Sequence, residues 1–214
     1  MNLDVPVYSQ AKDVKDCGPA ALKMILSYFG EDIDINKITD LSDPERSGVV
    51  PTVGLAKAAA QLGFKVELYT SSLEVDSKNF ELEFYKKEAS SYLGLVEKAK
   101  RLLEELTKYG GKAELKRLEL GEILSKINKD CVPLILLNWN TLFNLPDFQG
   151  HFVPITGYDD EFIFVNDPDV RKPGNKKIPR ALFDKSRKSQ GTDEDIIFIH
   201  RKRERGLCVN THEK

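Results

Sequence analysis

The feature of this 214-residue sequence that most restricts its fold is a short apolar run, Val132-Pro133-Leu134-Ile135-Leu136-Leu137. Successive side chains of a strand point to opposite faces, so an unbroken apolar run makes a strand apolar on both sides. The run is also shorter than an ordinary buried helix. We therefore predict that this segment is the central strand of a sheet.

A hairpin is predicted downstream of that run. Segments 152–158 and 162–165 are rich in apolar residues, and they flank the acidic triplet Asp159-Asp160-Glu161. Two such segments separated by a short polar stretch are typical of antiparallel strands joined by a tight turn. A last strand is expected over 196–200.

The first part of the chain favours helices. Pro19 stands just inside a predicted helix start, where its missing N–H costs no hydrogen bond, and apolar residues then recur at helical spacing until Gly30. The remaining expected elements are a helix over 35–41, a helix from the predicted N-cap Thr52 to Gly63, a strand over 64–69, one or two outer helices in the charged segment 71–111, a strand over 113–118 and a helix over 120–128. Helices followed by antiparallel strands predict an α+β fold with segregated layers.

Composition excludes several classes of function. The 32 Lys and Arg residues nearly balance the 34 Asp and Glu residues, so the net charge of -2 indicates no general attraction to nucleic acid or membrane surfaces. No segment reaches the roughly 18 apolar residues of a membrane span, and the first residues predict no secretory signal. Cys17, Cys131 and Cys208 form no CxxC pair, which fits a reducing compartment. We therefore predict a cytoplasmic protein, and the sequence leaves its oligomeric state open.

Cys17 is the first candidate for chemistry. It lies at a predicted helix N-terminus, where unpaired backbone N–H groups and the helix dipole favour thiolate over thiol. A polar loop precedes it and Gly18 and Pro19 follow it, so it stands where the chain enters the core. The alternative is a small buried hydrophobic residue, the common fate of a lone cysteine.

His151 and Asp167 are the second and third candidates. His151 stands at the start of the predicted hairpin, and Asp167 ends its second strand, just before Pro168. The turn at 159–161 lies close to midway between them, and cross-strand neighbours in a hairpin lie about 5 Å apart. The hairpin therefore predicts that the two residues are adjacent. The alternatives are a surface histidine and a simple Asn-Asp-Pro turn.

Gln10 is the fourth candidate. Its side-chain amide, a short loop ahead of Cys17, can donate an N–H to a developing oxyanion together with the Cys17 backbone N–H. A thiolate, an imidazole base and a third group that orients the imidazole are the parts needed for nucleophilic acyl transfer. The 134 positions from Cys17 to His151 fall in the range of papain-like enzymes.

Three segments together resemble the C39-like cysteine peptidase family. They are Gln10 with Asp16-Cys17-Gly18-Pro19-Ala20-Ala21-Leu22, then His151-Phe152-Val153-Pro154-Ile155-Thr156-Gly157-Tyr158-Asp159, then Val165-Asn166-Asp167-Pro168. Segment 48–68 is similar to the family's second helix and following strand, and the matched segments cover about half of the chain. The helical segment 71–111 is longer than its counterpart in the family's compact transporter domains, and it has room to lie over a substrate groove.

This resemblance implies a papain-like fold, with an N-terminal helical part packed on a C-terminal antiparallel sheet. It implies a cysteine peptidase in which Cys17 is the nucleophile, His151 the base, Asp167 the orienting residue and Gln10 the oxyanion donor. The family includes the leader-cleaving domains of bacteriocin-exporting ABC transporters, so the implied substrate is a peptide or protein, cut after small residues. Residues 1–200 would then form one peptidase domain with an insertion at about 71–111, and 201–214 a charged, flexible tail.

The remaining candidates have simpler explanations. Cys131 begins the apolar strand and is predicted to pack in the core, His200 ends a strand, and Cys208 and His212 lie in the terminal tail. The cysteines and histidines lack short ligand spacings, so we predict no metal and no cofactor. The loop between the central strand and His151 is hypothesised to line the substrate cleft, with core packing as the alternative, through Trp139, Leu142, Phe143, Leu145 and Phe148.

Two other functions fit the same residues. The cysteine and histidine serve equally well for acyl transfer from an amide or thioester in a non-protein substrate. The domain could also be a peptide-binding module of the same fold without turnover, although such a module has no need of all four candidate residues. Mass spectrometry of the products separates the first alternative from a peptidase.

Overall fold

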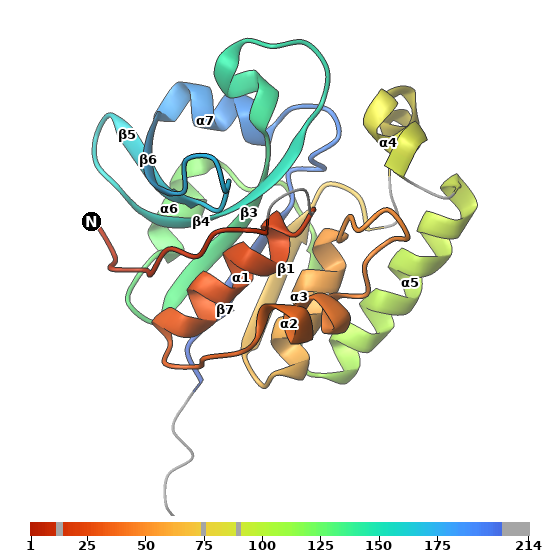
Figure 1. Ribbon diagram of the computed structural model, residues 1–214, viewed down its shortest axis with the longest axis horizontal. Helices are drawn as coiled ribbons and strands as arrows, with labels where there is room; N and C mark the ends of the chain where they lie inside the picture. Colours follow the sequence, from red (N-terminus) through yellow and green to blue (C-terminus); the bar gives the residue numbers. More distant parts are fainter. Residues whose placement is uncertain (12–14, 74–75, 89–90, 203–214) are drawn as a thin grey trace, which may run out of the picture.

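The computed structural model describes residues 1–11, 15–73, 76–88 and 91–202. Its main feature is a seven-stranded sheet in the order β2-β1-β7-β3-β4-β5-β6 (Figure 1). The strands are β1 (Lys65–Thr70), β2 (Lys112–Leu115), β3 (Cys131–Asn138), β4 (Gly150–Tyr158), β5 (Phe162–Asp167), β6 (Gly174–Pro179) and β7 (Ile196–His200). Neighbouring strands are antiparallel except β1 and β2, which run parallel.

Helices cover both faces of this sheet. The α-helices are α1 (Cys17–Tyr28), α2 (Ile35–Ser42), α3 (Thr52–Gln61), α4 (Glu83–Glu88), α5 (Tyr92–Lys108), α6 (Leu120–Lys126) and α7 (Arg180–Arg187), and two 3₁₀ helices span Ser77–Glu81 (η1) and Trp139–Phe143 (η2). Buried residues of α1 and α3 form one apolar cluster with the sheet, and those of α6 and α7 form a second.

The central strand β3 explains why two clusters exist. Leu134 and Leu136 belong to the cluster of α1 and α3, whereas Ile135 and Leu137 belong to the cluster of α6 and α7. This alternation along an apolar run gives the sheet two hydrophobic faces, and each must be covered to remove it from water. The prediction of a central strand is confirmed, since β3 lies between β7 and β4.

The predicted α+β fold is confirmed, and two details differ from the expectation. The sheet also includes β1 and β2, which pair in parallel. Parallel strands need a long crossover, and segment 71–111 provides it through η1, α4 and α5. The N-cap of α3 is Pro51 instead of Thr52, because the carbonyl of Pro51 already accepts the N–H of Gly54.

Two elements next to the hairpin carry no clear signal in the sequence. The edge strand β6 buries a single residue, Ile178, and α7 is rich in charged residues. Neither therefore has the apolar periodicity by which strands and helices are recognised. Both form because β5 offers a free edge to β6 and because Phe183 of α7 fills the second apolar cluster.

The description ends before the terminal tail. Residues 203–214, with Cys208 and His212, lie outside the described residues, so the predicted flexible tail stays a prediction. Among the helices of the described ranges, we find none whose length and apolar character would suit a bilayer crossing.

Candidate active site

Cys17 is the first residue of α1, as its sequence context predicts. The helix is packed tightly where it begins, because a Cβ on Gly18 would lie 2.8 Å from Leu55 of α3 and 3.2 Å from Phe152 of β4. A glycine after the cysteine therefore lets the N-terminus of α1 approach the strand that carries His151. The Cys17 side chain is partly exposed and lines a cavity.

His151 and Asp167 are both buried and form a hydrogen bond. Nε2–H of His151 donates to Oδ1 of Asp167 at 2.9 Å, and the N–H of Asp169 donates to the same oxygen at 2.8 Å. The other ring nitrogen of His151 is left for Cys17, and the thiol and the imidazole lie close enough for each to shift the pKa of the other. The structure thus brings Cys17, His151 and Asp167 into one row.

A β-bulge makes the contact between the two strands possible. Near the turn, Tyr158 pairs with Ile163, but beyond the bulge Ile155 pairs with Val165, so β4 holds one extra residue. Because successive side chains alternate between faces, a shift of one residue exchanges the faces. Without the bulge, His151 and Asp167 would point to opposite sides of the sheet.

The row of three residues changes the pKa values of its members. Burial alone would raise the pKa of Cys17, but the hydrogen bond and charge of His151, with backbone N–H groups of Phe152 and Gly18, lower it. Burial alone would lower the pKa of His151, but hydrogen bonds to Asp167 and Cys17 raise it to about 9. Both shifts favour a thiolate beside an imidazolium.

Replacing Cys17 by alanine should lower the pKa of His151, because the bond and charge of Cys17 disappear while the burial of the imidazole remains. The measurement is an NMR titration of the imidazole C–H signals. His200 is the internal control, since its pKa is lowered by burial and its acidic neighbour is Glu67, away from the site. An unchanged midpoint for His151 in the variant would contradict the interaction with Cys17.

Trp139 covers the catalytic histidine candidate. Its ring centroid lies 4.4 Å from that of His151, with the planes inclined at 49°. The hypothesis that the loop before His151 lines the cleft is correct only for Phe148. Trp139 and Leu142 pack with the second apolar cluster, and Phe143 and Leu145 are exposed. A short 3₁₀ helix turns these side chains away from the cavity, which the sequence pattern does not reveal.

The cavity at Cys17 and His151 has a volume of about 450 Å³. Gln10 also lines it, and its backbone N–H donates to the carbonyl of Pro168 at 2.8 Å, which holds the N-terminal segment beside the end of β5. All four predicted residues therefore lie in one place, three along the cavity and Asp167 behind His151.

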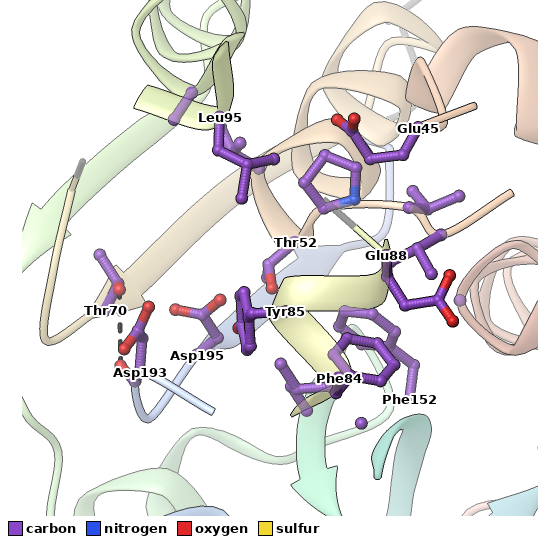
Figure 2. Close-up of a pocket in the computed structure, with 18 of the residues that line it drawn as sticks. Glu45, Thr52, Thr70, Phe84, Tyr85, Glu88, Leu95, Phe152, Asp193 and Asp195 are labelled. Carbon is purple, nitrogen blue, oxygen red and sulfur yellow. Dashed lines mark hydrogen bonds between the residues drawn. The ribbon is translucent and has the colours of Figure 1, made fainter. Parts of the chain in front are cut away.

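Residues of segment 71–111 form one wall of this cavity (Figure 2). Phe84 and Tyr85 of α4 lie against Phe148, with ring centroids 5.3 and 5.9 Å apart. The Tyr85 hydroxyl donates to the carbonyl of Gly191 at 2.7 Å, and Glu88 forms an ion pair with Lys15. The helix is thus tied to the rest of the molecule on two sides.

Two acidic residues of the cavity were missed at the sequence level. Asp193 and Asp195 lie in the loop before β7 and line the cavity on the side of Thr70 (Figure 2). The only available signal was the acidic triplet Asp193-Glu194-Asp195 immediately before an apolar strand.

The other candidate residues do not join the site. Cys131 is buried in the second apolar cluster, as predicted, and burial raises its pKa to about 12. His200 faces Glu67 at 3.3 Å. Within the described ranges, no three His, Cys, Asp or Glu side chains gather in a way that could hold a metal ion.

Comparison with known proteins identifies the family. A family model described as guanylylate cyclase matches residues 5–199. The chain belongs to this family. Guanylyl cyclase 1 of Arabidopsis thaliana is 26% identical over 222 residues, which cover 93% of this chain and 76% of that protein. The Bacillus subtilis protein YvpB is 38% identical over 50 residues, 23% of this chain and 19% of that protein.

The fold of this family member is that of C39 peptidase domains. The peptidase domain of Streptococcus ComA, a bifunctional ABC transporter, superposes with a TM-score of 0.51 at 14% identity, covering 92% of this chain and 98% of that one. A C39-like peptidase structure from Bacillus anthracis gives a TM-score of 0.51 at 17% identity, covering 92% and 94%. The predicted resemblance and the papain-like fold are thereby confirmed.

Proposed function

We propose that this protein is a cysteine peptidase that hydrolyses a peptide bond with Cys17 as nucleophile, His151 as base and Asp167 as orienting residue. The observation that carries the proposal is the row of the three residues beside an open cavity, with His151 hydrogen-bonded to Asp167 and its charge lowering the pKa of Cys17. A thiolate–imidazolium pair at the end of a helix has little structural value, whereas it is the reactive form in nucleophilic acyl transfer.

The reaction follows from the positions of these groups. The Cys17 thiolate attacks the carbonyl carbon, a C–S bond forms and the carbonyl electrons move to oxygen. The backbone N–H of Cys17 and the amide of Gln10 stabilise this oxyanion. The imidazolium of His151 gives its proton to the leaving amine as the C–N bond breaks. Neutral His151 then takes a proton from water, the resulting hydroxide attacks the acyl carbon, and the C–S bond breaks, which releases the acid and restores the thiolate and imidazolium.

Asp167 acts through His151. Its hydrogen bond to Nε2 directs Nδ1 toward Cys17 and favours the protonated ring. A peptide or protein cut after small residues is the substrate that the C39 likeness favours, and a reducing cytoplasm would keep Cys17 as a free thiol.

Membership of the guanylylate cyclase family favours a second candidate, the cyclisation of GTP. The charge of the cavity weighs against a triphosphate there, because Glu45, Glu88, Asp193 and Asp195 face it while its lysines, Lys15 and Lys98, are paired with Glu88 and Glu45. Incubation with GTP and magnesium, followed by mass spectrometry, tests this candidate. Cyclic GMP made by the purified protein and retained in Cys17→Ala would establish an activity separate from the cysteine.

The proposed peptidase requires Cys17 to be a thiolate at neutral pH. Because the pKa of Cys17 is lowered, its thiolate persists as pH falls below the ordinary value of about 8.5 and is lost only as pH falls through the lower, folded value. We expect the rate of Cys17 alkylation by iodoacetamide to be already at its plateau at neutral pH, and peptide mapping measures it.

His151→Ala is the matched variant for this experiment. Without the imidazolium, burial dominates, so the rate should rise only at pH values above those of an ordinary thiol. The thiol of glutathione serves as the reference. An alkylation profile of the wild-type protein that follows glutathione would contradict the proposed function.

A further inference from the structure

The cavity extends from Cys17 and His151 to the loop before β7, where Asp193 and Asp195 line it. The N–H of Leu136 donates to the carbonyl of Asp195 at 3.2 Å, and Leu136 pairs with Phe152, the neighbour of His151. Asp195 thus stands beside β3 just before β7 begins, and Leu136 and Phe152 lie on the next two strands. Two strand spacings amount to roughly 10 Å. The carboxylates of Asp193 and Asp195 are therefore about the length of one long side chain away from the part of the cavity that Cys17 and His151 line.

The contacts of the two acids come from different elements. The hydroxyl groups of Thr52, at the start of α3, and Thr70, at the end of β1, lie near the Asp195 carboxylate and act to lower its pKa. The Asp193 carboxylate accepts from the side-chain amide of Asn79 in η1 at 2.9 Å. The polar groups beside the two acids therefore include a neutral amide and neutral hydroxyls.

The charges of the cavity do not balance. Lys15 pairs with Glu88, and Lys98 pairs with Glu45 at 2.8 Å. In the part of the chain that the structure describes, neither Asp193 nor Asp195 has a lysine, arginine or histidine within ion-pair distance. Two neighbouring, partly buried carboxylates without a cation are unfavourable unless another molecule supplies one.

Between Asp193 and Asp195 at one end and Cys17 and His151 at the other, the cavity is mostly apolar. Its walls include Val50, Leu68, Phe84, Leu95, Leu103 and Phe148. In Figure 2, Phe84 and Phe152 lie on one side and Asp193 on the other, with Tyr85 and Asp195 between them. The occupant that fits such a space has an apolar stem and ends in a positive charge.

We propose that this part of the cavity is a specificity subsite for a basic group, a lysine- or arginine-like side chain of the substrate, with Asp193 and Asp195 as its charged partners and α4 as its apolar wall. The proposal rests on the proposed function, since it places the group relative to a scissile bond at Cys17. It adds a charge preference that the catalytic residues do not provide.

The pKa values of the acidic end agree with a missing cation. Burial, and then the charge of Asp193, raise the pKa of Asp195 to about 7. Burial and the same two acids raise the pKa of Tyr85. A bound ammonium group would lower the pKa of Asp195 again and draw both carboxylates into their charged form.

Three cysteine-reactive probes test the subsite without knowledge of the natural substrate. They are iodoacetamides with an aminobutyl, a hydroxybutyl or a carboxypropyl tail, and in each the Cys17 thiolate forms a C–S bond and displaces iodide. We expect the aminobutyl probe to alkylate Cys17 about tenfold faster than the hydroxybutyl probe. Its ammonium group would gain one charge-assisted hydrogen bond to the carboxylates, which is enough for a difference of this size. The carboxypropyl probe should be the slowest.

Asp195→Asn and Asp193→Asn should each reduce the preference for the aminobutyl probe and leave the hydroxybutyl rate unchanged. Glu45→Gln is the matched control, since it removes one carboxylate from the same cavity but from a pair with Lys98. An equal loss in this control would show a general charge effect and overturn the subsite. Thermal melting of each variant establishes that it is folded. One folded aspartate variant is sufficient for the comparison with Glu45→Gln.

The outcomes separate the subsite from the proposed function. Fast alkylation at neutral pH with equal rates for the three tails would overturn the subsite and leave the peptidase proposal standing. Slow alkylation by every probe, with the pH profile of an ordinary thiol, would overturn the proposed function and with it the subsite.

Discussion

Replacing Cys17 by alanine is expected to lower peptide hydrolysis by at least about 10⁴-fold, because the proposed acyl-enzyme forms on the Cys17 sulfur. Cys131, the other described cysteine, is buried in the second apolar cluster. The measurement is the appearance of new N-termini in a mixture of peptides, followed by mass spectrometry over time. The variant should melt near the wild-type temperature, since the change removes one partly exposed sulfur.

Cys131→Ala is the control for this experiment. It removes the same atom from a core position, so it should cost stability while leaving the rate per folded molecule unchanged. Hydrolysis that survives in Cys17→Ala would contradict the proposed mechanism. Binding of peptides without hydrolysis in the wild-type protein would favour the peptide-binding module instead.

Replacing Gly54 by alanine is expected to destabilise the protein by at least about 3 kcal/mol, because the new Cβ has no room. It would lie 2.1 Å from the carbonyl oxygen of Ser42, which is the last residue of α2 and fully buried. The close approach of α2 and α3 therefore depends on a glycine. Urea unfolding followed by circular dichroism measures the effect.

Gly121→Ala is the matched control, because it makes the same change in another helix. A Cβ on Gly121 of α6 meets no atom within 4 Å, so alanine should stabilise the helix by up to about 1 kcal/mol. Equal stability of the two variants would contradict the steric argument. Loss of folded Gly54→Ala protein together with normal recovery of Gly121→Ala would support it.

The effect at Gly54 should also reach the cavity. Gly54 lies two residues after Thr52, which begins α3 and whose hydroxyl acts to lower the pKa of Asp195. Any displacement of α3 away from α2 therefore moves one of the two hydroxyl groups near the Asp195 carboxylate. The packing of the helical layer and the charge of the cavity are connected through this residue.

Much of the fold could be predicted because its signals are local. The apolar run of β3 indicates a strand with two covered faces, and Pro19 and Gly30 mark the limits of α1 closely. The acidic turn at 159–161 indicates the hairpin, and Asp159 indeed accepts the N–H groups of Glu161 and Phe162. In each case the pattern reflects backbone preferences and side-chain alternation, which act between neighbours in the sequence.

The candidate site could be predicted only in part. Cys17 and His151 stand at the ends of elements that the sequence identifies, but the adjacency of His151 and Asp167 depends on the bulge between Ile155 and Gly157. The midpoint of the hairpin does not reveal this extra residue. The N-terminal segment bonds to β4 at this point, where the N–H of Leu3 donates to the carbonyl of Thr156 at 2.7 Å.

By itself, then, the sequence determined the class of fold, the order of its main elements and the identities of the four candidate residues, since periodicity and turn residues express these locally. Only the tertiary structure decided that His151 and Asp167 share a face, that α4 forms a wall of the cavity, and that Asp193 and Asp195 line the same cavity as Cys17 and His151. These features are contacts between segments far apart in the chain. They arise from strand register and packing across layers, which no local pattern encodes.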